Sequence, residues 1–100
     1  MTEPRTPCRT PAVGRDGVTN IPTWKFELIR NHILDLAREA GKEGFAFSAL
    51  KDALTMRLAP DEHAELGSVG WHATTVKLEM EVAGDIVRIA GVSPQRFRVA

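Results

Sequence analysis

One stretch, from Gly70-Trp71 to Gly84, constrains the fold of this chain more than any other. Apolar residues recur within it at steps of three and four, which places them on one side of a helix. These residues are Ala73, Val76, Met80 and Ala83. Gly84 favours the left-handed conformation that ends a helix, and the apolar run 86–89 that follows indicates a strand. The sequence therefore predicts a helix that leads directly into a strand.

Two more helices are expected upstream. Thr23 is a suitable N-cap for a helix over 24–40, and Gly41 supplies its C-terminal stop. The apolar stripe of this helix comprises Phe26, Ile29, Ile33, Leu36, Ala37 and Ala40. Ser48 is the expected cap of a second helix that runs to about Leu58, beyond which Pro60 prevents continuation. We expect at most one helical turn in the acidic connector 61–69.

Short extended segments complete the predicted domain. Residues 45–47 form a brief strand, and 86–89 and 97–99 form a C-terminal β-hairpin whose loop contains Gly91 and Pro94. Three helices plus this hairpin indicate an α+β domain. The order of elements is that of a winged helix-turn-helix, although the connector 61–69 is longer than the tight turn of a minimal helix-turn-helix.

The first 22 residues differ in composition from the rest of the chain. They contain four of the six prolines and few large apolar side chains. A segment of this kind cannot offset its ordering entropy. The sequence therefore predicts a flexible leader over 1–22, followed by the winged-helix-like domain over 23–100. The leader is interpreted as a solvated tail or, alternatively, as an arm that contacts DNA.

Charge and cysteine content limit the function classes. Thirteen basic residues balance thirteen acidic ones, so the chain lacks the strong positive charge of a dedicated nucleic-acid binder. Cys8 is the single cysteine, which excludes an intramolecular disulfide and a Cys-based zinc site. No apolar run approaches a membrane span or a signal-peptide core. We expect a cytoplasmic protein without a membrane partner.

The helix-to-strand stretch resembles a family of small uncharacterised bacterial proteins, a domain of unknown function. The matching positions are Gly70-Trp71, Thr75-Val76, Leu78-Glu79-Met80-Glu81 and Gly84, with a similar tail at Ser93-Pro94-Gln95-Arg96-Phe97-Arg98. The resemblance covers about the last four-fifths of the chain and leaves the leader outside. It implies a winged-helix-like fold and transfers no functional residue.

A winged helix predicts double-stranded DNA as the partner and a role in transcriptional control. Hydroxyls and a lysine on the third helix can reach bases or phosphates, and arginines of the hairpin can contact the backbone. The candidates are Thr74, Thr75, Lys77, Arg88, Arg96 and Arg98. Glu79 and Glu81 on the same helix oppose this interpretation, because carboxylates weaken the attraction to phosphate.

The alternative is a protein-interaction module, a homodimer or an adaptor, whose contact residues include Trp71 and Leu78. An exposed Leu/Trp pair suits a protein interface better than a phosphate surface. A further alternative is purely structural: Trp71 fills the core and Leu78 packs beneath the hairpin. Fold analogy alone does not choose between them.

No constellation of catalytic or metal-binding residues is evident. The three histidines, His32, His63 and His72, lack a metal-ligand spacing, and Cys8 has no structured base nearby. We therefore expect neither enzymatic activity nor a cofactor or metal.

Overall fold

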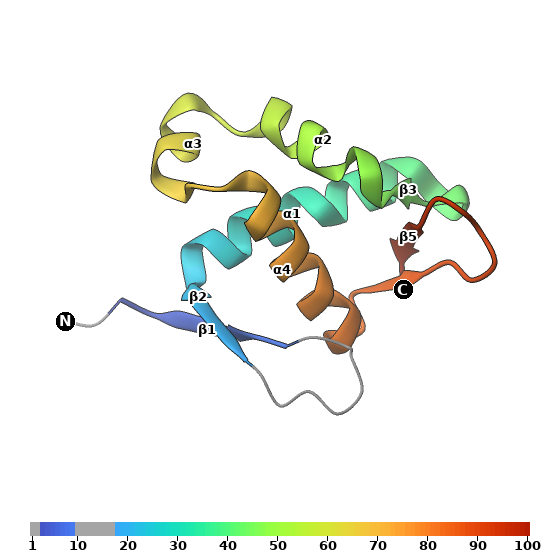
Figure 1. The fold of residues 1–100 in the computed structure, drawn as a ribbon, viewed down its shortest axis with the longest axis horizontal. Coiled ribbons are helices and arrows are strands. Elements are labelled where there is room, and N and C mark those ends of the chain that lie inside the picture. Colours follow the sequence, from blue (N-terminus) through green and yellow to red (C-terminus); the bar gives the residue numbers. More distant parts are fainter. Residues whose placement is uncertain (1–2, 10–17) are drawn as a thin grey trace.

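The computed structural model describes residues 3–9 and 18–100, which form an α+β domain (Figure 1). Its helices are α1 (Thr23–Ala40), α2 (Leu50–Arg57), α3 (Pro60–Leu66) and α4 (Val69–Ala83), with single 3-10 turns at Gly41–Glu43 and Phe47–Ala49. Its strands are β1 (Arg5–Cys8), β2 (Thr19–Pro22), β3 (Phe45–Ala46), β4 (Ile86–Arg88) and β5 (Arg96–Val99). The α+β class is confirmed, but the described residues contain four α-helices where three are predicted.

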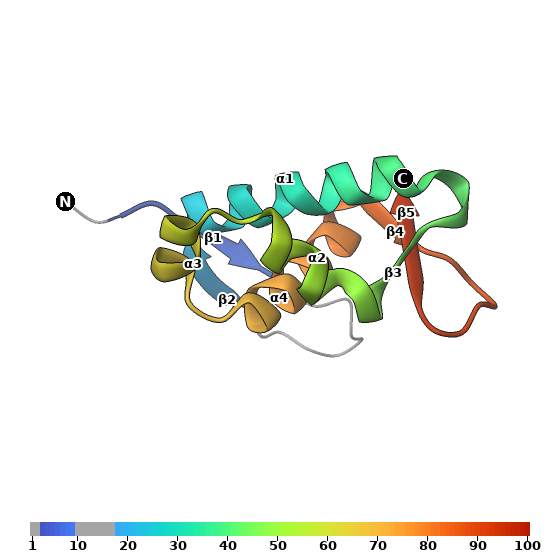
Figure 2. The same ribbon diagram turned by 90° about the horizontal axis from the view of Figure 1, so that it is seen from above.

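Helix α4 occupies the centre of the molecule, and α1, α2 and β1 all pack against it (Figures 1 and 2). The predicted stripes of α1 and α4 supply much of the core: Ile29, Ile33, Leu36, Ala37, Ala73, Val76 and Met80 are buried. Leu50, Leu54, Ile86 and Phe97 close the core from α2 and the C-terminal strands. Ala83, the last residue of the predicted α4 stripe, is exposed because it lies where the helix ends.

The C-terminal hairpin is confirmed, and it forms part of a three-stranded antiparallel sheet. β5 lies between β3 and β4, with Phe45 opposite Phe97 and Val87 opposite Arg98. Gly44 is required where β3 begins, because its φ is 78° and a Cβ there would lie 2.8 Å from the Phe97 carbonyl oxygen. Strand β3, one residue shorter than the predicted 45–47, thus adds the segment after α1 to the hairpin.

The described part of the predicted leader contains two strands, where the composition predicts a flexible segment. β1 and β2 pair antiparallel, with Arg5 opposite Pro22 and Cys8 opposite Thr19. Cys8 and Ile21 are buried in the common core, and the Thr23 N–H donates to the Pro4 carbonyl at 2.9 Å. Two buried apolar side chains are enough to order this hairpin, because the neighbouring helices already provide a surface against which they pack. The rest of the leader, 1–2 and 10–17, lies outside the described residues.

The segment after α2 also differs from the prediction. Residues 60–66 form helix α3, in which Pro60 starts the helix instead of only preventing the previous one from continuing. Glu62 accepts a hydrogen bond from the Ala59 N–H at 2.8 Å and so caps the start of α3. Ser48 lies within a 3-10 turn and caps no helix, and Thr23 is the first residue of α1 rather than its cap.

Candidate functional site

The ends of helix α4 follow directly from the sequence. Ser68 Oγ accepts a hydrogen bond from the Trp71 N–H at 3.1 Å, as an N-cap does. Gly84 ends the helix in the left-handed conformation, with φ 85° and ψ 15°. The predicted stop at Gly84 is confirmed, and together the two ends fix which side chains of α4 point into the domain and which point out.

Lys77 is the most deeply buried charged group of α4, with 1% of the side chain exposed. Its ammonium donates to Gln95 Oε1, pairs with the carboxylate of Glu81 and lies 4.7 Å from the centre of the Phe47 ring. These contacts tie α4 to the loop before β5 and to the turn before α2. Lys77 cannot reach a phosphate from this position, so the prediction that it contacts DNA is corrected. The reason is its spacing, four residues after Ala73 and three before Met80 on the buried side of the helix.

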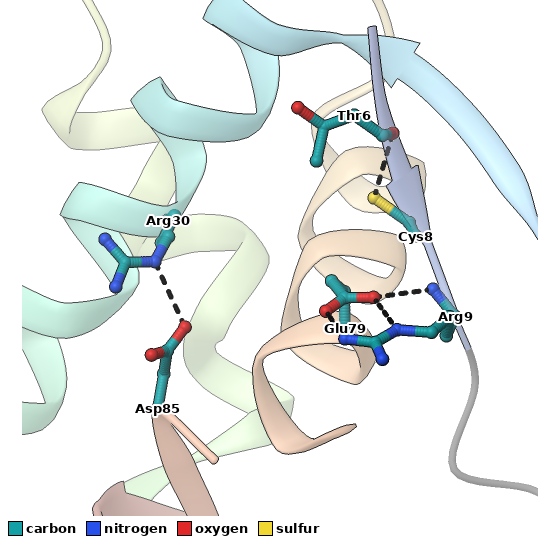
Figure 3. A network of polar contacts seen from close by, with 6 residues as sticks. All are labelled: Thr6, Cys8, Arg9, Arg30, Glu79 and Asp85. Atoms are coloured by element: carbon teal, nitrogen blue, oxygen red, sulfur yellow. Dashed lines mark hydrogen bonds and ion pairs between the residues drawn. The ribbon is translucent and has the colours of Figure 1, made fainter. Parts of the chain in front are cut away.

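Glu79 is a second buried charge, held by Arg9 at the end of β1 (Figure 3). Its carboxylate accepts hydrogen bonds from the Arg9 backbone N–H at 2.9 Å, from Nε at 2.8 Å and from Nη2 at 2.6 Å. The Arg9 guanidinium holds the pKa of Glu79 below its ordinary value. Burial, helped by the nearby Glu79 charge, raises the pKa of the Cys8 thiol to about 11. Glu79 therefore fastens the N-terminal hairpin to α4 and leaves Cys8 protonated.

The opposite side of α4 is uncharged and open to solvent. It consists of Trp71, Thr74, Thr75, Leu78 and Val82, which we call the outward face. Trp71 is 48% exposed and Val82 is 37% exposed, while Leu78 and Thr75 are half-buried. The structural interpretation that placed Trp71 in the core is wrong. The indole packs edge-on against His72, with ring centres 4.8 Å apart.

His72 marks the boundary between the two sides of α4. Its ring is buried and its Nδ1 donates to the Ser68 carbonyl oxygen at 2.7 Å. Burial lowers the pKa of this imidazole, so it is neutral at pH 7 and adds no charge to the outward face.

The six predicted DNA contacts differ in how accessible they are. Arg96 is half-buried and donates to the Gly44 carbonyl oxygen at 3.0 Å, where it braces β3. Arg88 and Arg98 are exposed on β4 and β5, and Arg88 Nη2 lies 3.7 Å from Glu81. Thr74 is exposed on α4. Of the six candidates, Thr74, Arg88 and Arg98 are exposed, Thr75 and Arg96 are half-buried, and Lys77 is buried.

Sequence reasoning missed the contacts that hold these elements together. Arg9 and Glu79 are 70 positions apart, and no local pattern connects them. Gln95 reaches Lys77 from an irregular loop. The one local signal for the burial of Lys77 was its spacing from the apolar residues Ala73 and Met80.

In residues 3–9 and 18–100, no three His, Cys, Asp or Glu side chains are grouped to hold a metal ion. None of the helices there is both long and apolar enough to cross a membrane.

The comparisons with known proteins give one match. Residues 5–97 match a family of unknown function, DUF6958. No curated protein and no solved structure matches the chain. The match begins at β1, so the N-terminal hairpin belongs to the family domain and does not lie outside it as expected. The chain therefore belongs to the DUF6958 family, a family whose function is unknown.

Proposed function

We propose that this domain is a winged helix with two additions. The order α1, β3, α2, α4, β4, β5 and the position of β5 between its two neighbours support this assignment. In this interpretation α4 is the third helix of the motif, and β4 and β5 form the wing. Helix α3 is inserted before the third helix, and the β1–β2 hairpin is added at the N-terminus.

We propose that the domain functions as an interaction module that pairs with a second copy of itself through the outward face of α4. The observation that carries this proposal is the distribution of charge on α4. Its lysine is buried, Glu79 is paired with Arg9, and the exposed side chains are uncharged. A helix that binds phosphate requires accessible cations, whereas exposed Trp, Leu and Val side chains suit a protein contact.

This charge distribution favours a second copy of the chain as the partner that covers the outward face. A two-fold contact brings the same surface patch of each subunit together, so a charged patch would face like charges. The outward face carries none. Five side chains on one helix are fewer than the 20–30 residues per side of a stable interface, so we expect a weak, reversible dimer.

Sedimentation velocity over a concentration series tests this proposal. We expect the wild type to shift reversibly from monomer to dimer, and Leu78→Glu to remain monomeric and folded because it places two carboxylates at the centre of the contact. Met56→Glu is the matched control, since Met56 on α2 is 87% exposed and lies outside the outward face. A wild type that stays monomeric at the highest concentration reached, or equal loss of dimer in both variants, would contradict it.

DNA binding in transcriptional control remains a second candidate function. The accessible Thr74 and the exposed Arg88 and Arg98 on the wing strands favour it. Anisotropy of labelled duplex DNA at ~50 and ~200 mM salt tests it. Arg98→Ala should weaken binding to all sequences and flatten the salt dependence, and Thr74→Ala should change sequence preference. The absence of binding at low salt would rule this function out.

A further inference from the structure

A second surface lies at the far end of α1, where β5 packs beside it (Figure 2). A cavity of about 270 Å³ opens between the last turn of α1, the following 3-10 turn and β5. Its walls are formed by Ala37, Arg38, Gly41, Lys42, Arg98 and Val99. None of these residues belongs to α4, so this cavity is separate from the outward face.

Among residues 3–9 and 18–100, three cationic side chains and no carboxylate line the cavity. Lys42 and Arg98 are exposed, and the hydrogen bond of the Arg98 side chain goes to the Val99 carbonyl oxygen at 3.0 Å. Arg38 lies 3.5 Å from Asp35, but both side chains are more than half exposed, and solvent screens such a pair. The positive charge of the cavity is therefore largely uncompensated.

The surrounding carboxylates do not change this balance. Glu39 on α1 is engaged by Arg57 of α2 at 2.6 Å. Glu43 follows Lys42 in the 3-10 turn, is exposed and does not line the cavity.

The backbone at the C-terminal end of α1 repels an anion less than an ordinary helix end does. The C-terminal end of a helix exposes carbonyl oxygens that repel negative charge. At α1 the chain turns at Gly41, with φ 65°, and the Gly41 N–H donates to the carbonyl oxygens of Ala37 and Arg38. Ala37 is buried and Val99 is half-buried, so they provide an apolar floor beneath the cations.

We propose that this cavity is an anion site that binds the phosphate group of a small phosphorylated molecule. Guanidinium and ammonium groups from separate elements bind phosphate oxygens through charge-assisted hydrogen bonds. Ligand cavities commonly span ~300–1,000 Å³, so the volume suits a phosphate monoester and not a large ligand. This anion site is separate from the surface proposed for self-association and does not depend on it.

The test is an NMR titration of ¹⁵N-labelled protein with inorganic phosphate and with glycerol phosphate, against chloride at matched ionic strength. We expect saturable shifts at residues 37–42 and 98–99 with both phosphates and not with chloride. Lys42→Gln and Arg98→Gln should each weaken binding by about tenfold, the loss of one charged hydrogen bond. Lys51→Gln is the matched control, because Lys51 is an exposed lysine of α2 that does not line the cavity.

Three results would overturn the assignment. These are shifts that do not saturate, equal shifts with chloride, and equal weakening by Lys51→Gln. A final arm adds a short DNA duplex to the phosphate complex. If the duplex displaces glycerol phosphate and binds far more tightly through the same residues, the phosphate belongs to a nucleic-acid backbone and the small-molecule assignment fails. The same spectra report whether each variant is folded.

Discussion

The two sides of helix α4 differ from those of an ordinary surface helix, because charged side chains are buried beside the apolar stripe and apolar side chains are exposed on the other side. The side that faces the domain carries Lys77 and Glu79, whereas the side that faces solvent presents Trp71, Leu78 and Val82. Surface helices normally point apolar residues inward and charges outward. The difference indicates that the charges of α4 hold the fold together and that its apolar residues are available for contact with another chain.

The buried charges act at places where apolar contact is scarce. Lys77 holds the loop before β5, and Glu79 holds the end of β1. Each strand involved is short, and short hairpins are marginal on their own. Charged hydrogen bonds therefore fasten both hairpins to the central helix.

The largest effect is expected for Lys77→Ala. Removal of the ammonium leaves the Glu81 carboxylate buried with only the more distant Arg88, so we expect the free energy of unfolding to fall by about 3 kcal/mol. Urea unfolding measures this loss. A Lys77→Ala/Glu81→Ala double variant should recover part of it. If Lys77→Ala unfolds like the wild type, the lysine does not hold the fold.

Glu79→Gln should have the next largest effect, about 1.5 kcal/mol, because charged hydrogen bonds to the partly exposed Arg9 are lost. The pKa of Glu79 is lowered in the folded state. Its stabilisation is therefore present above its ordinary pKa of 4.5 and disappears as the pH falls through the lowered value. The stabilities of wild type and variant should converge in acid. A constant difference down to low pH would contradict the role of the ionised carboxylate.

A smaller effect is expected from Arg9→Ala, which releases the end of β1 but leaves Cys8 and Ile21 in the core. Burial and the raised pKa make the Cys8 thiol unreactive at pH 8. Alkylation by iodoacetamide should be slow in the wild type and several-fold faster in Arg9→Ala, because local opening exposes the thiol. Glu3→Ala, at an exposed residue just before the same strand, is a suitable control. Equal rates in wild type and Arg9→Ala would show that Arg9 does not hold β1.

The smallest effect on stability is expected on the outward face. Trp71→Ala removes a side chain that is about half exposed, so the free energy of unfolding should change by no more than about 1 kcal/mol. Self-association should nevertheless be weakened, since buried aromatic residues dominate protein contacts. A loss of several kcal/mol would show that Trp71 belongs to the core.

Local patterns predicted the elements better than they predicted the contacts. Ser68 and Gly84 are recognisable as the ends of α4 because capping depends on neighbouring residues. The order of helices and the C-terminal hairpin follow from apolar spacing in the same way. Helix α3 was missed because Pro60 indicates equally the end of one helix and the start of another.

The candidate site was only partly predictable. Leu78 was identified as a contact residue by its position opposite the apolar stripe, and Trp71 as a partly covered side chain beside it; the structure leaves both at least partly exposed. Lys77 was assigned to DNA because a lysine on the third helix can reach a phosphate, but the structure places it on the inner side of α4. The partner of Glu79 could not be found, because Arg9 is distant in the sequence and lies in a segment whose composition indicates flexibility.

The most direct test compares two adjacent residues of α4 changed to the same side chain, Leu78→Gln and Glu79→Gln, by sedimentation equilibrium beside the wild type. The outward-face account predicts that Leu78→Gln loses the dimer, whereas Glu79→Gln, measured at neutral pH where it remains folded, keeps it. A dimer retained by Leu78→Gln and lost by Glu79→Gln, or a wild type without a dimer, would contradict the account.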